Sequence, residues 1–243
     1  NPLESHDALS QSRFTIPVSL VLLLDETASL SQGSPRFQES ALGAIRSLLA
    51  LDYPEFEVIV VVEHLSSDTL GALKAAWDME PHEFFFRQSL STSAVRRIYR
   101  SRREERLVVV DKVPGGQADG LNCGVNLARF RYVALVPPDA SLESDALLRA
   151  MAPALRDPAR VVATVSQLER VGGGGEHLRS ARSLLVSRIG WPWLQSGLPE
   201  DAVVIWRRDA VLQAGGFDAK AIEPCLDLTV ALQTSARGPE GGL

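Results

Sequence analysis

Uninterrupted apolar runs recur along the chain, and each one ends at polar or acidic residues. They lie at residues 17–24, 56–64, 107–111 and 132–136. Runs of Val, Leu and Ile of this length are typical of central parallel strands that are buried on both faces. Between the first two runs, residues 36–51 carry apolar side chains at helical spacing. This strand, helix, strand unit predicts an α/β fold with right-handed crossovers.

The rest of the chain continues the alternation less regularly. Further helices are predicted near 68–79, 115–130, 143–155 and 226–235, and one more is predicted to end at Gly215 and Gly216. Further strands are predicted at 83–86, 160–166 and 202–208. Residues 172–175 predict a flexible glycine loop. The arginine-rich stretch 96–106 predicts a solvated face, with an anion or lipid-headgroup surface as the alternative.

Length and composition favour one domain. The chain has 243 residues, of which 45% are hydrophobic, enough for one substantial core. We assign residues 17–236 to this domain, residues 1–16 to an N-terminal extension and residues 237–243 to a tail. A net charge of −5 with mixed signs gives no reason to expect a nucleic-acid partner.

Compartment and membrane contact follow from the cysteines and the apolar runs. Cys123 and Cys225 are far apart and lack metal-ligand spacing, so neither a disulfide framework nor a zinc site is predicted, and a cytoplasmic location is expected. No apolar run reaches the roughly 20 residues of a membrane helix. The chain starts without Met and ends in a polar tail, as an excised segment would, so flanking membrane segments and the cytoplasmic face of a membrane are the alternative.

The polar residues that follow the strands should carry any function. Ligands of open α/β sheets bind outside the carboxyl ends of the strands. The residues at these ends are Asp25 and Glu26, Glu63 and His64, Asp111 and Lys112, and Asp139. We therefore expect these side chains to meet at one edge of the sheet.

Six segments carry a resemblance to a known family. In chain order they are VSLVLLLDE, LDYPEFEVIVVVEHLSSD, GGQADGLNCGV, VALVPPDAS, WRRDAVLQAGGFD and LDLT, between residues 18 and 229. This series resembles glycosyltransferase family 2, whose members read roughly VSVVIPAYNE, LDYPxFEVIVVDDGSTD, GGKAxALNxGL, a DxD triplet, FRRxAVxxxGGFD and LDLT. The resemblance implies the GT-A fold: a mostly parallel, mixed sheet flanked by helices, with a Rossmann-like half that binds a nucleotide sugar.

The resemblance also implies which residues would contact such a donor. Glu63 falls on the first residue of the family's acidic pair, which contacts base and ribose, while His64 departs from it. Asp68 is kept, with a helix N-cap as its alternative role. Gly115 and Gly116 either approach the donor with their backbone or form a tight turn. The remaining candidates are Gln117 and Asn122; Asn122 either orients the glycine loop or caps it.

The family's catalytic acids are largely replaced. Transfer from a nucleoside diphosphate needs stabilisation of the departing diphosphate, usually by Mg²⁺ or Mn²⁺ on carboxylates. Pro137 and Pro138 occupy the first two DxD positions, which leaves Asp139 as the one metal-ligand candidate, so we expect no metal, with Mg²⁺ or Mn²⁺ as the alternative. The positions of the acidic pair that carries the base hold Pro224 and Cys225. The nearby acids, Glu223 and Asp227, are the catalytic candidates that remain.

Three hypotheses follow. The first is a pseudo-glycosyltransferase domain with little or no transferase activity, which serves a binding, regulatory or assembly role linked to polysaccharides, with a protein partner in a larger assembly. The second is an active inverting transferase with a divergent site that uses a nucleoside-diphosphate sugar. The third is a domain that only docks to a protein or a membrane. The candidate ligands are a nucleoside-diphosphate sugar or a glycan.

Overall fold

A computed structural model describes most of the chain. The described residues are 15–27, 35–83, 85–138, 140, 142–159, 161–170, 178–185, 202–221 and 223–235. Nearly all of the predicted extension, the whole predicted tail, the glycine loop at 172–175 and Asp139 lie outside these ranges.

The described strands form one mixed sheet with a parallel centre. Its strand order is β3-β4-β5-β2-β1-β6-β9-β7-β8. The parallel strands are β5 (Leu107–Lys112), β2 (Phe56–Glu63), β1 (Val18–Asp25) and β6 (Tyr132–Val136). The antiparallel strands are β3 (Met79–Pro81), β4 (Val95–Ser101), β9 (Ala202–Arg207), β7 (Ala163–Arg170) and β8 (Leu178–Leu185). The predicted α/β class and the mixed sheet are confirmed.

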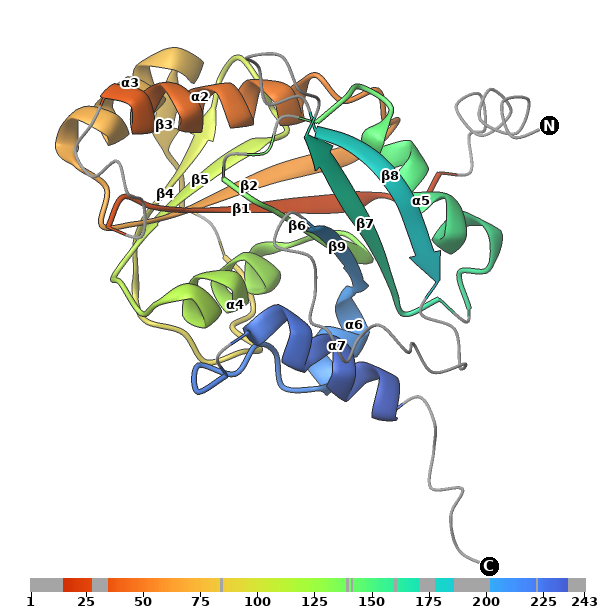
Figure 1. Ribbon diagram of the computed structural model, residues 1–243. Coiled ribbons are helices and arrows are strands. Elements are labelled where there is room, and N and C mark those ends of the chain that lie inside the picture. The colour runs from red at the N-terminus through yellow and green to blue at the C-terminus, as the bar shows by residue number, and fades with distance from the viewer. Residues whose placement is uncertain are drawn as a thin grey trace, which may run out of the picture.

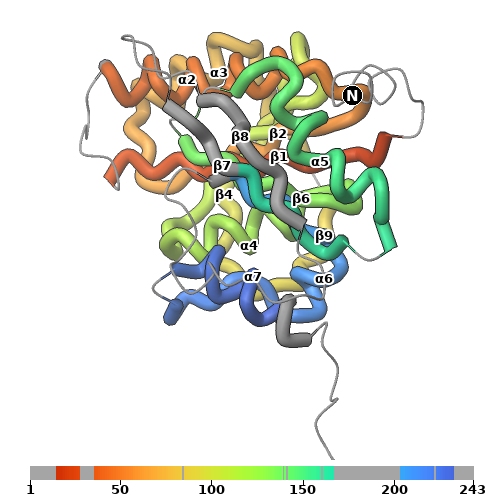
Figure 2. The backbone as a smooth tube through the Cα atoms, turned by 45° about the vertical axis from the view of Figure 1, so that its right-hand side comes forward, coloured from red at the N-terminus to blue at the C-terminus, as the bar shows by residue number. Residues whose placement is uncertain are grey.

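Helices cover both faces of this sheet (Figure 1). On one face lie α2 (Pro35–Leu49), α3 (Ser67–Trp77) and α5 (Ala146–Arg156). On the other lie α4 (Gln117–Leu127), α6 (Arg208–Gln213) and α7 (Pro224–Ser235). The view turned by 45° shows the same two layers on either side of β1 and β2 (Figure 2). None of the helices in the described part of the chain is both long and apolar enough to span a bilayer.

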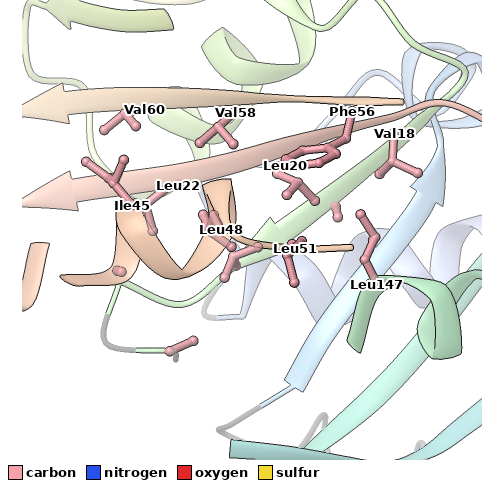
Figure 3. Packing of buried hydrophobic residues seen from close by; sticks show 14 of the residues in the cluster. Val18, Leu20, Leu22, Ile45, Leu48, Leu51, Phe56, Val58, Val60 and Leu147 are labelled. Carbon is pink, nitrogen blue, oxygen red and sulfur yellow. The ribbon is translucent and has the colours of Figure 1, made fainter. Parts of the chain in front are cut away.

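Alternation along the central strands explains why both faces are covered. In β1, Leu20, Leu22 and Leu24 belong to the core on the α2 side, whereas Val21 belongs to the core on the α4 side. Figure 3 shows the first of these cores, where Leu20 and Leu22 pack together with Ile45 and Leu48. Because both faces of β1 need cover, the apolar run is continuous instead of alternating with polar residues.

Between residues 78 and 101, one predicted strand was wrong and one strand was not predicted. Residues 85 and 86 form no strand; instead the short β3 begins at Met79, directly after α3. The helix ends early because Asp78 adopts the left-handed conformation, with φ 50°. The arginine-rich stretch begins as strand β4, which pairs with β5 and buries Ile98. The run of arginines concealed this strand, since it interrupts the apolar pattern by which the other strands were predicted.

The arginine side chains themselves are largely solvated, as predicted. Arg96 and Arg97 are exposed. Arg96 forms an ion pair with Asp111 at 3.3 Å, and Arg102 forms one with Glu80 at 2.6 Å. Exposed pairs of this kind contribute little to stability.

Candidate functional site

The carboxyl ends of the central strands meet at one edge, as the sequence predicts for an open α/β sheet. Asp25 at the end of β1 lies in register with Glu63 at the end of β2. On the other side of β2, Val62 lies in register with Asp111 of β5. This register brings the residue after Asp111, Lys112, next to Glu63. The edge therefore holds a dense group of charged side chains.

The centre of this group is a buried lysine between two carboxylates. The side chain of Lys112 is 0% exposed, and that of Glu63 is 1% exposed. The Lys112 ammonium donates to Glu63 Oε1 at 2.5 Å and to the carbonyl of Val113 at 2.8 Å. It also forms an ion pair with Asp119 in the first turn of α4. We call Glu63, Lys112 and Asp119 the buried charge cluster.

Burial and ion pairing shift the pKa of Lys112 in opposite directions. Burial lowers the pKa of the ammonium, but its hydrogen bonds to Asp119 and Glu63 outweigh burial and raise the pKa above its usual value. Lys112 is therefore charged at neutral pH. A buried charge of this kind persists in a fold only when it is paired and hydrogen-bonded.

The second oxygen of Glu63 holds the glycine turn. Glu63 Oε2 accepts hydrogen bonds from the backbone N–H of Gly115 at 3.3 Å and of Gly116 at 3.1 Å. Gly116 is the N-cap of α4 and has a φ of 87°, a backbone conformation that residues other than glycine rarely adopt. A Cβ on Gly115 would collide with the carboxylate of Asp119. Both glycines thus form a tight turn around the buried charge cluster; whether they contact a donor stays a prediction.

Asp119 and Asn126 hold the segment that precedes β4 against α4. Asp119 Oδ2 accepts from the backbone N–H of Ser93 at 2.7 Å. One helical turn after Asn122, Asn126 accepts from the backbone of Ser89 and Leu90 and donates to the carbonyl of Leu90. The segment 89–93 is therefore held against α4 by side chains of the helix.

Asn122 holds a different segment. Its amide oxygen accepts from the backbone N–H of Phe217 at 2.8 Å, and its amide nitrogen donates to the carbonyl of Phe217 at 2.9 Å. Its hydrogen bonds thus go to residues 215–218, which we call the GGFD segment. They do not fit either predicted role of Asn122, which was to orient the glycine loop at 115–116 or to cap it. Gly216 precedes Phe217 with a φ of 81°, and a Cβ there would collide with Asn122.

Three side chains at the strand ends offer ligand atoms that are close together. The ligand atoms of Asp25, Glu63 and His64 lie within 4.8 Å of one another. His64 Nδ1 is 3.4 Å from Asp25 Oδ1, and His64 has a left-handed φ of 48°. Burial raises the pKa of Asp25, but hydrogen bonds from Thr27 and the proximity of His64 outweigh it and lower the pKa. Asp25 is therefore ionised at neutral pH.

Two of the predicted donor contacts lie exposed at helix starts. Asp68 is exposed in the first turn of α3. It is not the N-cap, because Ser66 takes that position and accepts from the backbone N–H of Thr69 at 3.3 Å. The backbone N–H of Ser66 in turn donates to Glu26 Oε2 at 2.7 Å. Gln117 is exposed at the start of α4.

The two catalytic candidates flank the first turn of α7. Glu223 and Asp227 are exposed, whereas Pro224 is buried and Cys225 is half-buried. Burial, with a further contribution from Glu223, raises the pKa of the Cys225 thiol to about 11. The second cysteine, Cys123, lies buried in α4, where burial raises its pKa to about 12. Both thiols are therefore protonated at neutral pH.

This protonation predicts slow alkylation. At pH 7.5 and with iodoacetamide, we expect Cys225 in the folded chain to react on the order of 100-fold more slowly than a cysteine peptide, because the thiolate is the nucleophile. Mass spectrometry of quenched samples measures the rate, and the chain in guanidinium is the control. Reaction at the rate of the peptide would contradict a raised pKa.

Sequence reasoning missed two members of the buried charge cluster as site residues. Lys112 was expected only as one of several strand-end residues, and Asp119 was not singled out. The available signal was a lysine that follows an apolar strand at an edge rich in acids. A cation at that place needs a carboxylate partner if it is buried.

Two solved structures of glycosyltransferases have a similar fold. A mannosyltransferase, PcManGT from Pyrobaculum calidifontis in complex with GDP-Man and Mn²⁺, matches with a TM-score of 0.59 at 15% identity. The match covers 95% of this chain and 59% of the mannosyltransferase. S. aureus TarS in complex with UDP-GlcNAc matches with a TM-score of 0.55 at 17% identity, over 89% of this chain and 53% of TarS. No protein-family model matches the sequence, and a search of curated proteins returns no match.

These similarities define the fold. The chain has the α/β architecture of GT-A glycosyltransferases. It spans a little over half the length of the solved chains that it matches. A shared fold at such low identity leaves the chemistry to be argued from the site.

Proposed function

We propose that this chain is a divergent GT-A domain of the glycosyltransferase family 2 kind with little or no transferase activity. Its role is then binding, regulation or assembly, linked to polysaccharides, at a cytoplasmic location or at the cytoplasmic face of a membrane. A nucleoside-diphosphate sugar or a glycan is the candidate small-molecule ligand, and a protein is the candidate partner. The GT-A architecture and the six ordered sequence segments support the ancestry.

One observation carries the loss of activity: no carboxylate stands at the two positions that the resemblance assigns to the acidic pair of the base, which hold Pro224 and Cys225. An inverting transferase needs a group that takes the proton of the acceptor hydroxyl, and such a base contributes roughly 10²–10⁴ in rate. Cys225, with a pKa of about 11, holds its proton at neutral pH. Its neighbour Pro224 is buried and has no ionisable side chain.

The residues at the strand ends also fit a catalytic metal poorly. Asp25, Glu63 and His64 would offer two oxygens and one nitrogen. The Lys112 ammonium lies 2.5 Å from Glu63 and already supplies the positive charge that a cation would bring. A metal ion bound to Glu63 would lie near this ammonium, and like charges repel each other. We therefore derive no catalytic step through a metal, and Asp139 lies outside the described residues.

A turnover assay tests the proposal. We expect the chain, incubated with GDP-mannose or UDP-GlcNAc and Mn²⁺, to release nucleoside diphosphate no faster than the heat-denatured chain, because no carboxylate stands at the base position. Coupled detection of the released diphosphate measures the rate. Release above this background that is lost in Glu223→Gln or Asp227→Asn would show an active transferase and overturn the proposal.

A further inference from the structure

The buried ammonium of Lys112 has no hydrogen left to donate elsewhere. An ammonium has three N–H groups. Lys112 directs them to three acceptors: Glu63 Oε1, a carboxylate oxygen of Asp119 and the carbonyl of Val113. The side chain is wholly buried. Lys112 is therefore fixed in place by partners on three segments: the end of β2, the start of α4 and the residue that follows β5.

Glu63 is occupied from inside the protein in the same way. A carboxylate offers about four acceptor positions. Lys112 takes one on Oε1, and Gly115 and Gly116 take two on Oε2. The side chain of Glu63 is 1% exposed, so the remaining position does not face solvent. An incoming N–H donor would have to displace one of these internal donors.

Asp119 completes the closure. One of its oxygens pairs with Lys112, and the other accepts from the backbone N–H of Ser93. The buried charge cluster thus ties together β2, the glycine turn and the segment before β4. The turn that would have to open toward a ligand is held by two of the hydrogen bonds made by Glu63.

We propose that Lys112 is an internal occupant of the nucleoside position: its ammonium takes the Glu63 acceptor that a base N–H would use, and this keeps nucleoside diphosphates out. The inference rests on the proposed function, because it assumes that Glu63 stands where a GT-A domain contacts the nucleoside. It assigns to Lys112 the exclusion of a ligand, beyond the loss of the catalytic base. Of the candidates named under the proposed function, it therefore favours the glycan and the protein over the nucleoside-diphosphate sugar.

The test is a gain of binding. Lys112→Met removes the ammonium but leaves two carboxylates unpaired, and a buried carboxylate without its partner destabilises a fold strongly. The double variant Lys112→Met with Asp119→Asn removes one charge of each sign, so the net charge of the cluster is unchanged, and Glu63 keeps the hydrogen bonds from Gly115 and Gly116. Lys74→Met is the matched control, because Lys74 of α3 hydrogen-bonds Tyr99 at 2.8 Å, outside the buried charge cluster.

Isothermal titration calorimetry with UDP and with GDP, with and without Mn²⁺, provides the readout, and circular dichroism checks that each variant is folded. We expect no saturable binding to the wild-type chain or to Lys74→Met. In the double variant we expect saturable binding, at least about tenfold tighter than the weakest affinity that the titration detects. Saturable binding to the wild-type chain would overturn the inference, and so would a folded double variant that binds no better. Wild-type binding without turnover would leave the proposed function standing.

Discussion

Replacing Trp206 by alanine is expected to lower the free energy of unfolding by about 3–5 kcal/mol, among the largest effects of a single substitution in this chain. Trp206 in β9 is 0% exposed. Its ring meets that of Phe217 edge to face, with centroids 5.4 Å apart. Its indole N–H donates to Thr229 Oγ1 of α7 at 3.1 Å. The substitution removes the packing that joins β9, the GGFD segment and α7.

Urea unfolding followed by circular dichroism measures this loss. Phe85→Ala is the matched control, because Phe85 is 98% exposed, and a surface substitution changes the free energy of unfolding by less than about 0.5 kcal/mol. Thr229→Val keeps the packing but removes both hydrogen bonds of the hydroxyl, the one accepted from Trp206 and the one donated to the carbonyl of Cys225. It should cost only about 1–3 kcal/mol, the range for leaving the buried indole donor unpaired. Equal losses in Trp206→Ala and Phe85→Ala would contradict the packing role.

Asn122→Ala is expected to destabilise the chain by about 2–6 kcal/mol, because it leaves two backbone groups of Phe217 without their partner and each costs about 1–3 kcal/mol. Asn122→Asp keeps the acceptor for the Phe217 N–H but loses the donor and buries a charge. It should therefore rescue little. Thermal and urea unfolding measure both variants.

Gln117→Ala serves as the control on the same helix, because Gln117 is exposed in the first turn of α4. Its free energy of unfolding should stay within about 0.5 kcal/mol of the wild-type value. If Asn122→Ala were as mild as Gln117→Ala, the hydrogen bonds to Phe217 would not hold the GGFD segment in solution.

The centre of the sheet was predictable because its strands need cover on both faces. Continuous apolar runs such as 17–24 leave few alternatives to a buried parallel strand. The acids near the ends of these runs mark the edge at which ligands of open α/β sheets bind. The strand β4 was not predictable in this way. Its identity depends on pairing with β5 and on one buried side chain, Ile98, within a series of arginines.

The candidate site was predictable in its location and less so in its contacts. Glu63 was expected to face a ligand, but its partners Lys112, Gly115 and Gly116 come from a segment about 50 residues later in the chain. Local patterns do not encode such pairings. Asn122 shows the same limit, since its partner Phe217 is separated from it by 95 residues.

The two asparagines of α4 hold their partner segments through backbone atoms only. Asn126 binds the main chain of Ser89 and Leu90, and Asn122 binds the main chain of Phe217. Since every residue except proline has the same N–H and C=O, these attachments do not depend on the side chain at the held positions. Evolution or protein engineering can therefore diversify the surface of the 89–93 segment, at an exposed position such as Ser89, while α4 keeps it anchored.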